Sequence, residues 1–216
     1  MTMQSTAPTS LMAWQSLWSE LNLAGNAALW HGRLVTAYQD PAQRYHNLQH
    51  IEECLWELRD VQCFALEPTQ LRFALWFHDA VYDSHSARNE EDSAELAASC
   101  LETASAPAEL VQGVRELVMS TKSHAAGRHP DAGLMIDIDL AILGQPNERF
   151  DSYELGIRAE YEWVPLATYC SKRAEILTGF LARPTLYTAD YFRSKYETAA
   201  RHNLARSITR LRAGTA

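Results

Sequence analysis

The sequence predicts an all-α fold, and three features of the 216-residue chain lead to that prediction. Alanine and leucine are abundant, whereas the β-branched residues valine and isoleucine occur only seven times each. No stretch alternates apolar and polar residues in the pattern of a half-buried strand. Nearly every segment instead repeats its apolar residues every three or four positions, which is the spacing of one helix face.

In the first third of the chain, the predicted helices begin at residues that favour helix starts. Asn47 is a good N-cap residue, and the helix that it begins is expected to run to about residue 64. Pro68 stands where the first turn of a helix tolerates proline, and that helix is expected to continue through Tyr82. Two earlier segments carry tryptophan and leucine at helical spacing, residues 10–23 and 27–39. Residues 1–9 are expected to form a flexible tail.

The rest of the chain continues in the same way. Six further helices are predicted, over residues 89–103, 107–121, 134–143, 147–163, 166–182 and 189–212. Residues 122–133, KSHAAGRHPDAG, contain the glycine, proline, histidine and aspartate that are typical of a loop. Because no internal repeat or low-complexity linker divides the chain, residues 10–216 are expected to form a single helical domain.

The composition predicts a soluble, cytoplasmic protein. Hydrophobic residues make up 47% of the chain, which is enough for one sizeable core. The net charge of −8 and the pI of about 5.5 disfavour binding of bulk duplex nucleic acid, which usually needs a basic face. The four cysteines form no CxxC pair and are expected to be reduced. The polar N-terminus lacks the pattern of a signal peptide, and no apolar run reaches the roughly 20 residues of a membrane helix.

Two polar pairs interrupt the apolar pattern of the predicted helices. His78 and Asp79 lie in LRFALWFHDAVY and are expected to point toward the core, where unpaired polar groups are costly. Asp137 and Asp139 stand in DIDLAILG among isoleucine and leucine, where a carboxylate needs a counter-charge. One of these two acids can face solvent, because their positions are about 200° apart on a helix. An ordinary hydrogen-bonded core histidine would also explain His78, so neither pair alone indicates a metal.

A third element, RYHNLQHI, carries two histidines four residues apart. His50 borders an apolar helix face, whereas His46 stands at the mouth of the helix, where a solvated histidine would also fit. Together, the imidazoles of His50 and His78 and the carboxylates of Asp79 and Asp139 form a ligand set for a divalent cation. Such nitrogen and oxygen ligands suit Mn, Fe, Mg, Co, Ni or Zn. The cation would activate water for attack on phosphorus, and His46 would protonate the leaving oxygen.

The order of these motifs resembles the HD superfamily of metal-dependent phosphohydrolases. The chain is most similar to predicted bacterial HD phosphohydrolases, whose signature matches YHNLQHI, FHDAVYD, NEEDSA, TKSH and DIDLAILG here and extends toward ETAARHNL. This resemblance implies an HD-domain helical bundle in which His50 binds the metal and His46 acts as general acid. It also favours Asp139 over Asp137 as the ligand. One position departs from the related phosphodiesterases, because Tyr82 replaces the histidine of their HDxxH pattern, and this argues against their two-metal site.

Several further residues are candidates for contacts with the metal or the substrate. His124 could be an additional ligand or, with Lys122, a phosphate contact. The others are expected to hold substrate or to orient ligands: Arg44, Asn47, Tyr82, Glu90 and Asp137. Asn47 is expected to do so by capping the helix that carries His50.

The function that this sequence predicts is hydrolysis of a small phosphorylated substrate, nucleotides included. Two alternatives stay open. The first is an HD-fold di-iron oxygenase, which would need further histidine ligands, and His124 and His129 are the obvious donors. The second is a metal- or nucleotide-binding module without turnover. A homodimer is among the assemblies that this sequence allows.

Overall fold

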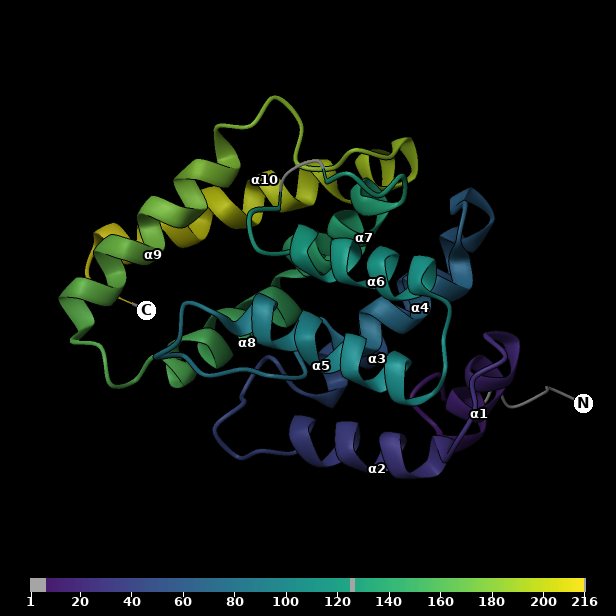
Figure 1. The fold of residues 1–216 in the computed structure, drawn as a ribbon. Coiled ribbons are helices and arrows are strands. Elements are labelled where there is room, and N and C mark those ends of the chain that lie inside the picture. Colours follow the sequence, from purple (N-terminus) through teal and green to yellow (C-terminus); the bar gives the residue numbers. More distant parts are fainter. Residues whose placement is uncertain (1–6, 125–126, 216) are drawn as a thin grey trace, which may run out of the picture. The chain divides into compact units, whose positions relative to one another are not determined.

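The computed structural model describes residues 7–124 and 127–215, and no strand occurs in this part of the chain (Figure 1). The all-α prediction is therefore confirmed. The described residues divide into two compact units, 7–41 with 46–124 and 127–136, and 42–45 with 137–215. Residues 1–6 of the expected tail lie outside the described residues, and the single domain expected from the sequence stays a prediction. None of the helices in the described ranges has the length and apolar character needed to cross a bilayer.

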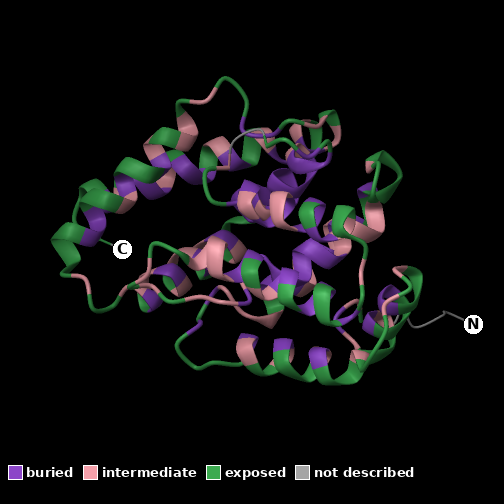
Figure 2. Ribbon diagram, viewed as in Figure 1, coloured by how far each residue is buried: buried purple, intermediate pink, exposed green. Residues whose placement is uncertain are grey.

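The first unit is built around one central helix, α4 (Pro68–Phe77). This helix contacts four others, α1 (Leu11–Glu20), α3 (Leu48–Val61), α5 (Asn89–Thr103) and α6 (Ala108–Ser120). Six of its ten residues are buried (Figure 2). Trp14 of α1 packs against it, with ring centroids 5.6 Å from Phe73 and 5.3 Å from Trp76. The unit also contains α2 (Ala27–Tyr38), η1 (Gln62–Phe64) and the first residues of α7 (Ala132–Asp139).

Polar side chains set where several of these helices begin. The side chains of Ser10, Asn26 and Asn47 accept backbone N–H groups in the first turns of α1, α2 and α3. Asn47 accepts from Gln49 and from His50, at 2.9 and 3.4 Å. The cap expected from the sequence at Asn47 is confirmed, and it fixes the start of the helix so that His50 lies in its first turn.

The structure corrects the predicted end of α4. The sequence pattern suggested a helix through Tyr82, but the α-helix ends at Phe77. Past this point, side chains of α5 bind the backbone that would otherwise make helical hydrogen bonds. Ser93 bonds both the N–H and the carbonyl of Val81, and Asn89 bonds both of these groups of Asp83. His78 and Asp79 therefore lie in a turn at the end of α4 rather than inside the helix.

The second unit consists of η2 (Leu140–Gly144), α8 (Asn147–Glu160), α9 (Leu166–Leu181) and α10 (Asp190–Arg212). The long helix α10 packs along α9 and against η2. Gly144 permits this close packing, because a Cβ there would lie 2.4 Å from the Cβ of Tyr196. The sequence pattern predicted one helix over 134–143, whereas the chain changes from α7 to the 3-10 helix η2 after Asp139. Asn203 binds the carbonyls of Leu143 and Gln145 at the end of η2.

Charged groups inside the second unit are paired. Arg173 binds Glu154 and the Tyr153 hydroxyl, and the Ser207 hydroxyl donates to Glu154 at 2.6 Å. Glu160 is buried and accepts the backbone N–H of Tyr45 at 2.7 Å, while the Tyr45 ring packs edge-on against Tyr153. These contacts anchor the segment 42–45 in the second unit.

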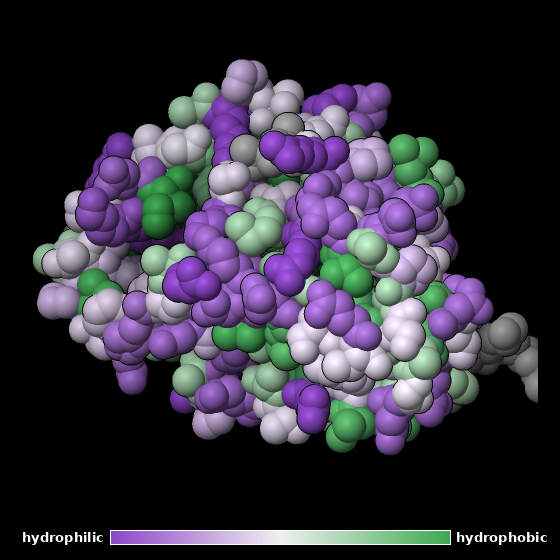
Figure 3. All heavy atoms as spheres, in the orientation of Figure 1, coloured by the Kyte–Doolittle hydropathy of each residue, from purple (hydrophilic) through white to green (hydrophobic). Residues whose placement is uncertain are grey.

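On the surface of the protein, hydrophilic residues predominate on the face drawn in Figure 3, in keeping with the net charge of −8.

Candidate metal centre

The candidate metal centre lies where α3 and the end of α4 meet in the first unit. His50, in the first turn of α3, is 2% exposed, and His78, the C-cap residue of α4, is 1% exposed. The backbone at the end of α4 is held by the Tyr38 hydroxyl, which donates to the Trp76 carbonyl at 2.9 Å. Two imidazoles are thus placed side by side in the core by two separately fixed helix ends.

The tautomer of His78 is set by its own helix. Its Nδ1 lies 2.9 Å from the carbonyl of Leu75, and because a carbonyl only accepts, this ring nitrogen carries a proton. When the ring is neutral, as a metal ligand must be, Nε2 keeps its lone pair. This is the arrangement in which protein histidines bind metals, with one nitrogen fixed by a hydrogen bond and the other directed at the ion. With no metal bound, a proton on Nε2 can instead bond Oδ2 of Asp79, 3.1 Å away.

Three ligand-type atoms converge at this point. The Nε2 atoms of His50 and His78 are 3.1 Å apart, and Oδ2 of Asp79 lies 3.4 Å from the first and 3.1 Å from the second. Ligands bound at about 2.1 Å to one ion stand about 3.0 to 3.4 Å apart, depending on whether the angles are octahedral or tetrahedral. The three separations fall in this range, so the residues fit a divalent cation.

The Asp79 carboxyl is ionised in this environment. Burial opposes its ionisation, but His78, His46 and the hydrogen bonds with His50 and His78 outweigh burial and hold the pKa of Asp79 far below its usual range. Its side chain is 16% exposed, so this carboxylate is more accessible to solvent than the two imidazoles. A charged carboxylate between two imidazoles is the form that a metal ligand must have.

Cys54 joins this group and was not predicted from the sequence, which suggested only a core thiol. Its Sγ lies 3.7 Å from Nδ1 and 3.8 Å from Nε2 of His50, and it is buried. The ligand atoms of His50, Cys54 and His78 lie within 4.8 Å of one another, so these three residues could hold a metal ion. The signal that could have found it is its position four residues after His50, on the same helix face.

His46 stands beside His50. Its ring centroid is 6.2 Å from that of His50, and its ring stacks on Tyr82 with centroids 3.9 Å apart and an angle of 23° between the planes. His46 is half-buried, whereas His50 is fully buried. The two histidines of RYHNLQHI therefore differ in position: one belongs to the converging atoms and the other stands beside them, closer to solvent.

The two acids of DIDLAILG are in the second unit and have different surroundings. Asp137 is fully buried and accepts the backbone N–H groups of Thr188 and Ala189 at 2.8 and 2.7 Å, and the Thr188 hydroxyl at 2.9 Å. Burial raises the pKa of Asp137, although these hydrogen bonds oppose the shift. Asp137 thus holds the segment that leads into α10. Asp139 is the half-buried last residue of α7, and its ligand role stays a prediction.

Replacing Asp137 by alanine is expected to lower the free energy of unfolding by about 1 to 3 kcal/mol, because a buried carboxylate that accepts three hydrogen bonds from the partly exposed Thr188 and Ala189 is removed. Chemical denaturation would measure the loss. Asp190→Ala is the matched control, since Asp190 lies on the exposed surface of α10 and its ion pair with Arg193 contributes little. Bound metal should be unchanged in both variants. A loss of metal from Asp137→Ala at unchanged stability would show a ligand role instead.

Other predicted site residues have structural partners or positions of their own. Lys122 forms an ion pair with Glu91 and donates to the Ala87 carbonyl at 3.1 Å. Glu90 lies in the first turn of α5, where a carboxylate is favourable to the helix dipole. Arg44 is exposed and belongs to the segment 42–45 of the second unit. The substrate or orienting roles of all three stay predictions.

The two loop histidines are also placed differently. His124 has a positive φ of 46°, which is uncommon for a residue other than glycine, and it directly precedes residues 125–126, which lie outside the described part. His129 is buried, its Nε2 bonds Oε1 of Gln70, and its Nδ1 accepts the backbone N–H of Asp131. Both ring nitrogens of His129 are therefore engaged at the opposite end of α4 from His78.

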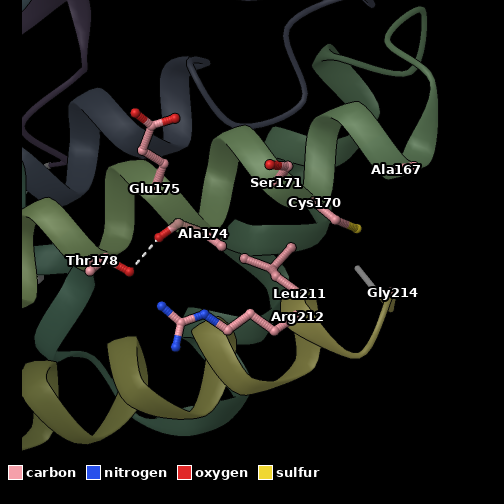
Figure 4. A pocket seen from close by; sticks show the side chains of 9 residues that line it. All are labelled: Ala167, Cys170, Ser171, Ala174, Glu175, Thr178, Leu211, Arg212 and Gly214. Atoms are coloured by element: carbon pink, nitrogen blue, oxygen red, sulfur yellow. Dashed lines mark hydrogen bonds between the residues drawn. The ribbon is translucent and has the colours of Figure 1, made fainter.

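A surface pocket of about 620 Å³ lies between α9 and the end of α10 in the second unit (Figure 4). None of the predicted site residues is among the described residues that line it. Its Thr178 hydroxyl donates to the Ala174 carbonyl within α9, and Arg212 extends into the space from α10. The pocket lacks the convergent ligand atoms seen in the first unit, so the candidate site is the histidine and aspartate group.

No family model, no curated protein and no solved structure matches this chain. The candidate metal centre therefore rests on the residues and distances described above.

Proposed function

We propose that the protein is a metal-dependent phosphohydrolase that cleaves a small phosphate ester, nucleotides included. The observation that carries the proposal is the convergence of two buried imidazole nitrogens and an ionised carboxylate oxygen, with a third, more accessible imidazole beside them. A structural histidine cluster needs no such extra imidazole. A hydrolytic centre can use it, because an alkoxide leaving oxygen departs far more easily when an acid protonates it.

The residues divide into binding and proton-transfer roles. We assign His50, His78, Asp79 and Asp139 as ligands, the last supported by the DxDL pattern of the sequence. When bound, a divalent cation supplies Lewis-acid activation of water and neutralises phosphate charge. His78 keeps Nε2 directed at the centre through its bond to Leu75, and Asp79 adds negative charge at the accessible side. His46 delivers a proton to the leaving oxygen.

The substrate class follows from charge and compartment. A chain with net charge −8 repels a long polyanion, whereas a cation in the centre can attract one small phosphate. The four cysteines are free thiols, which supports the cytoplasm as the place of the reaction. A homodimer stays a prediction about the assembly.

Phosphate release from a panel of small esters, measured with Mn, Mg, Co or Ni added, tests the proposal. We expect hydrolysis by the purified full chain that a chelator abolishes and that added metal restores. Metal analysis of the same sample should give bound divalent cation. Two irons per chain, oxygen uptake and no ester cleaved would contradict the proposal and favour the oxygenase. Bound metal without turnover of any ester would favour the binding module.

A further inference from the structure

The backbone between the HD pair and α5 is held by two reciprocal pairs of hydrogen bonds. On one side, Ser93 receives the N–H of Val81 at 3.0 Å and donates to the Val81 carbonyl at 3.2 Å. Ser93 is fully buried, and its one hydroxyl satisfies both backbone polar groups of the half-buried Val81. This fixes the residue immediately before Tyr82.

On the other side, Asn89 holds the residue immediately after Tyr82. Its Oδ1 accepts the N–H of Asp83 at 3.0 Å, and its Nδ2 donates to the Asp83 carbonyl at 3.0 Å. Asn89 and Ser93 are four residues apart on α5, so one face of this helix supplies both pairs of hydrogen bonds. Tyr82 is therefore the single residue between two fixed backbone positions.

The ring of Tyr82 lies on His46. Their centroids are 3.9 Å apart and their planes are nearly parallel, a close offset-stacking distance for aromatic rings. His46 precedes the start of α3 and lacks the helical backbone that holds His50. We infer that Tyr82, held by Asn89 and Ser93, is a positioning residue that orients the His46 imidazole beside the metal centre.

The role of His46 as proton donor rests on the proposed function. The stacking of Tyr82 on His46 does not depend on it. It gives a reason for tyrosine at the position where related phosphodiesterases have histidine. The phenol ring of Tyr82 stacks on His46 without adding an imidazole nitrogen that could act as a further ligand. The inference also assigns a structural role to the NEEDSA segment, because its Asn89 and Ser93 hold the loop that carries Tyr82.

Ring-proton NMR of the full chain tests the stack without any substrate. A parallel ring at this distance shields the facing protons, so the His46 Cε1 proton should resonate upfield of that of exposed His85 in the unmodified protein. The resonance is identified by its absence in His46→Ala. Tyr82→Leu should remove the upfield shift, and Tyr82→Phe should keep it. An unshifted His46 resonance in the unmodified protein, or one that Tyr82→Leu leaves in place, would overturn the inference.

Variants of Ser93 and Asn89, which hold the backbone on either side of Tyr82, test the inference while leaving Tyr82 itself unchanged. Ser93→Ala and Asn89→Ala should each reduce the upfield shift of His46. Ser120→Ala is the matched control, because Ser120 is also buried in the first unit but donates only within α6, to Leu117. That variant should leave the His46 resonance in place. If Ser93→Ala and Ser120→Ala change the His46 resonance equally, the hydrogen bonds of Ser93 do not hold Tyr82 in place.

Kinetics then connect the stack to catalysis. On any ester that the protein hydrolyses, Tyr82→Leu should lower kcat by about 10- to 100-fold at unchanged metal content, since a general acid held out of place delivers its proton poorly. Tyr82→Phe should recover most of the rate. If no ester is hydrolysed, the proposed function fails while the NMR result still decides the role of Tyr82. An unchanged kcat in Tyr82→Leu, with the shift removed, would overturn the positioning role.

Discussion

The variant His78→Ala is expected to lose bound metal and ester hydrolysis together. His78 supplies one of the three converging atoms, and its ring is held in the orientation of a ligand by the Leu75 carbonyl. Loss of a hydrogen-bond partner of a ligand commonly costs about 10- to 100-fold in metal affinity or activity, so loss of the ligand itself should cost at least about 100-fold. Asp79→Ala should act in the same direction.

Metal analysis and initial rates, with circular dichroism to confirm folding, would measure this effect. His129→Ala is the matched control, because it is another buried histidine of the first unit with both ring nitrogens bonded, at the other end of α4. It should lose stability but keep metal and activity. If His78→Ala keeps the metal while His129→Ala loses it, the centre is misassigned and a histidine ligand set that includes the loop becomes the better explanation.

Helices with strong local signals were predictable from the sequence. The segment 89–103 has the predicted bounds, and Asn47 caps α3 as its side chain led us to expect. Such features depend on residues within a few positions of one another, where periodicity and capping chemistry act directly. The end of α4 was predicted five residues too late, because the polar groups that end it come from Asn89 and Ser93 on another helix.

In the candidate site too, the residues within short motifs were predictable, whereas contacts between distant parts of the chain were not. The sequence singled out His50, His78 and Asp79, and their atoms do converge. Three contacts depend on residues far apart in the chain and could not be derived from spacing. They are the stack of Tyr82 on His46, the pairing of Lys122 with Glu91, and the hydrogen bonds that Thr188 and Ala189 donate to Asp137.

The variant His46→Ala is expected to keep its metal and to lose catalytic rate. His46 is half-buried, stacks on Tyr82 and lies beside the converging atoms, which suits a proton donor better than a ligand. Loss of a general acid typically costs about 10²- to 10⁴-fold in rate. The loss should depend on the substrate, because an acidic leaving group departs without a proton. We therefore expect a large deficit with an alkyl phosphate and a small one with 4-nitrophenyl phosphate.

Comparing kcat for these two esters in the unmodified protein, His46→Ala and His85→Ala separates the roles of the two histidines in YHNLQHI. His85 is an exposed histidine bonded to Asp83, so its removal controls for the loss of an imidazole. A smaller deficit with the better leaving group, at full metal content, would show that His46 donates the proton. Loss of metal from His46→Ala would reverse the assignment, making His46 a ligand and leaving His50 as the donor. Equal deficits with both esters would mean that His46 acts before the bond to the leaving oxygen breaks.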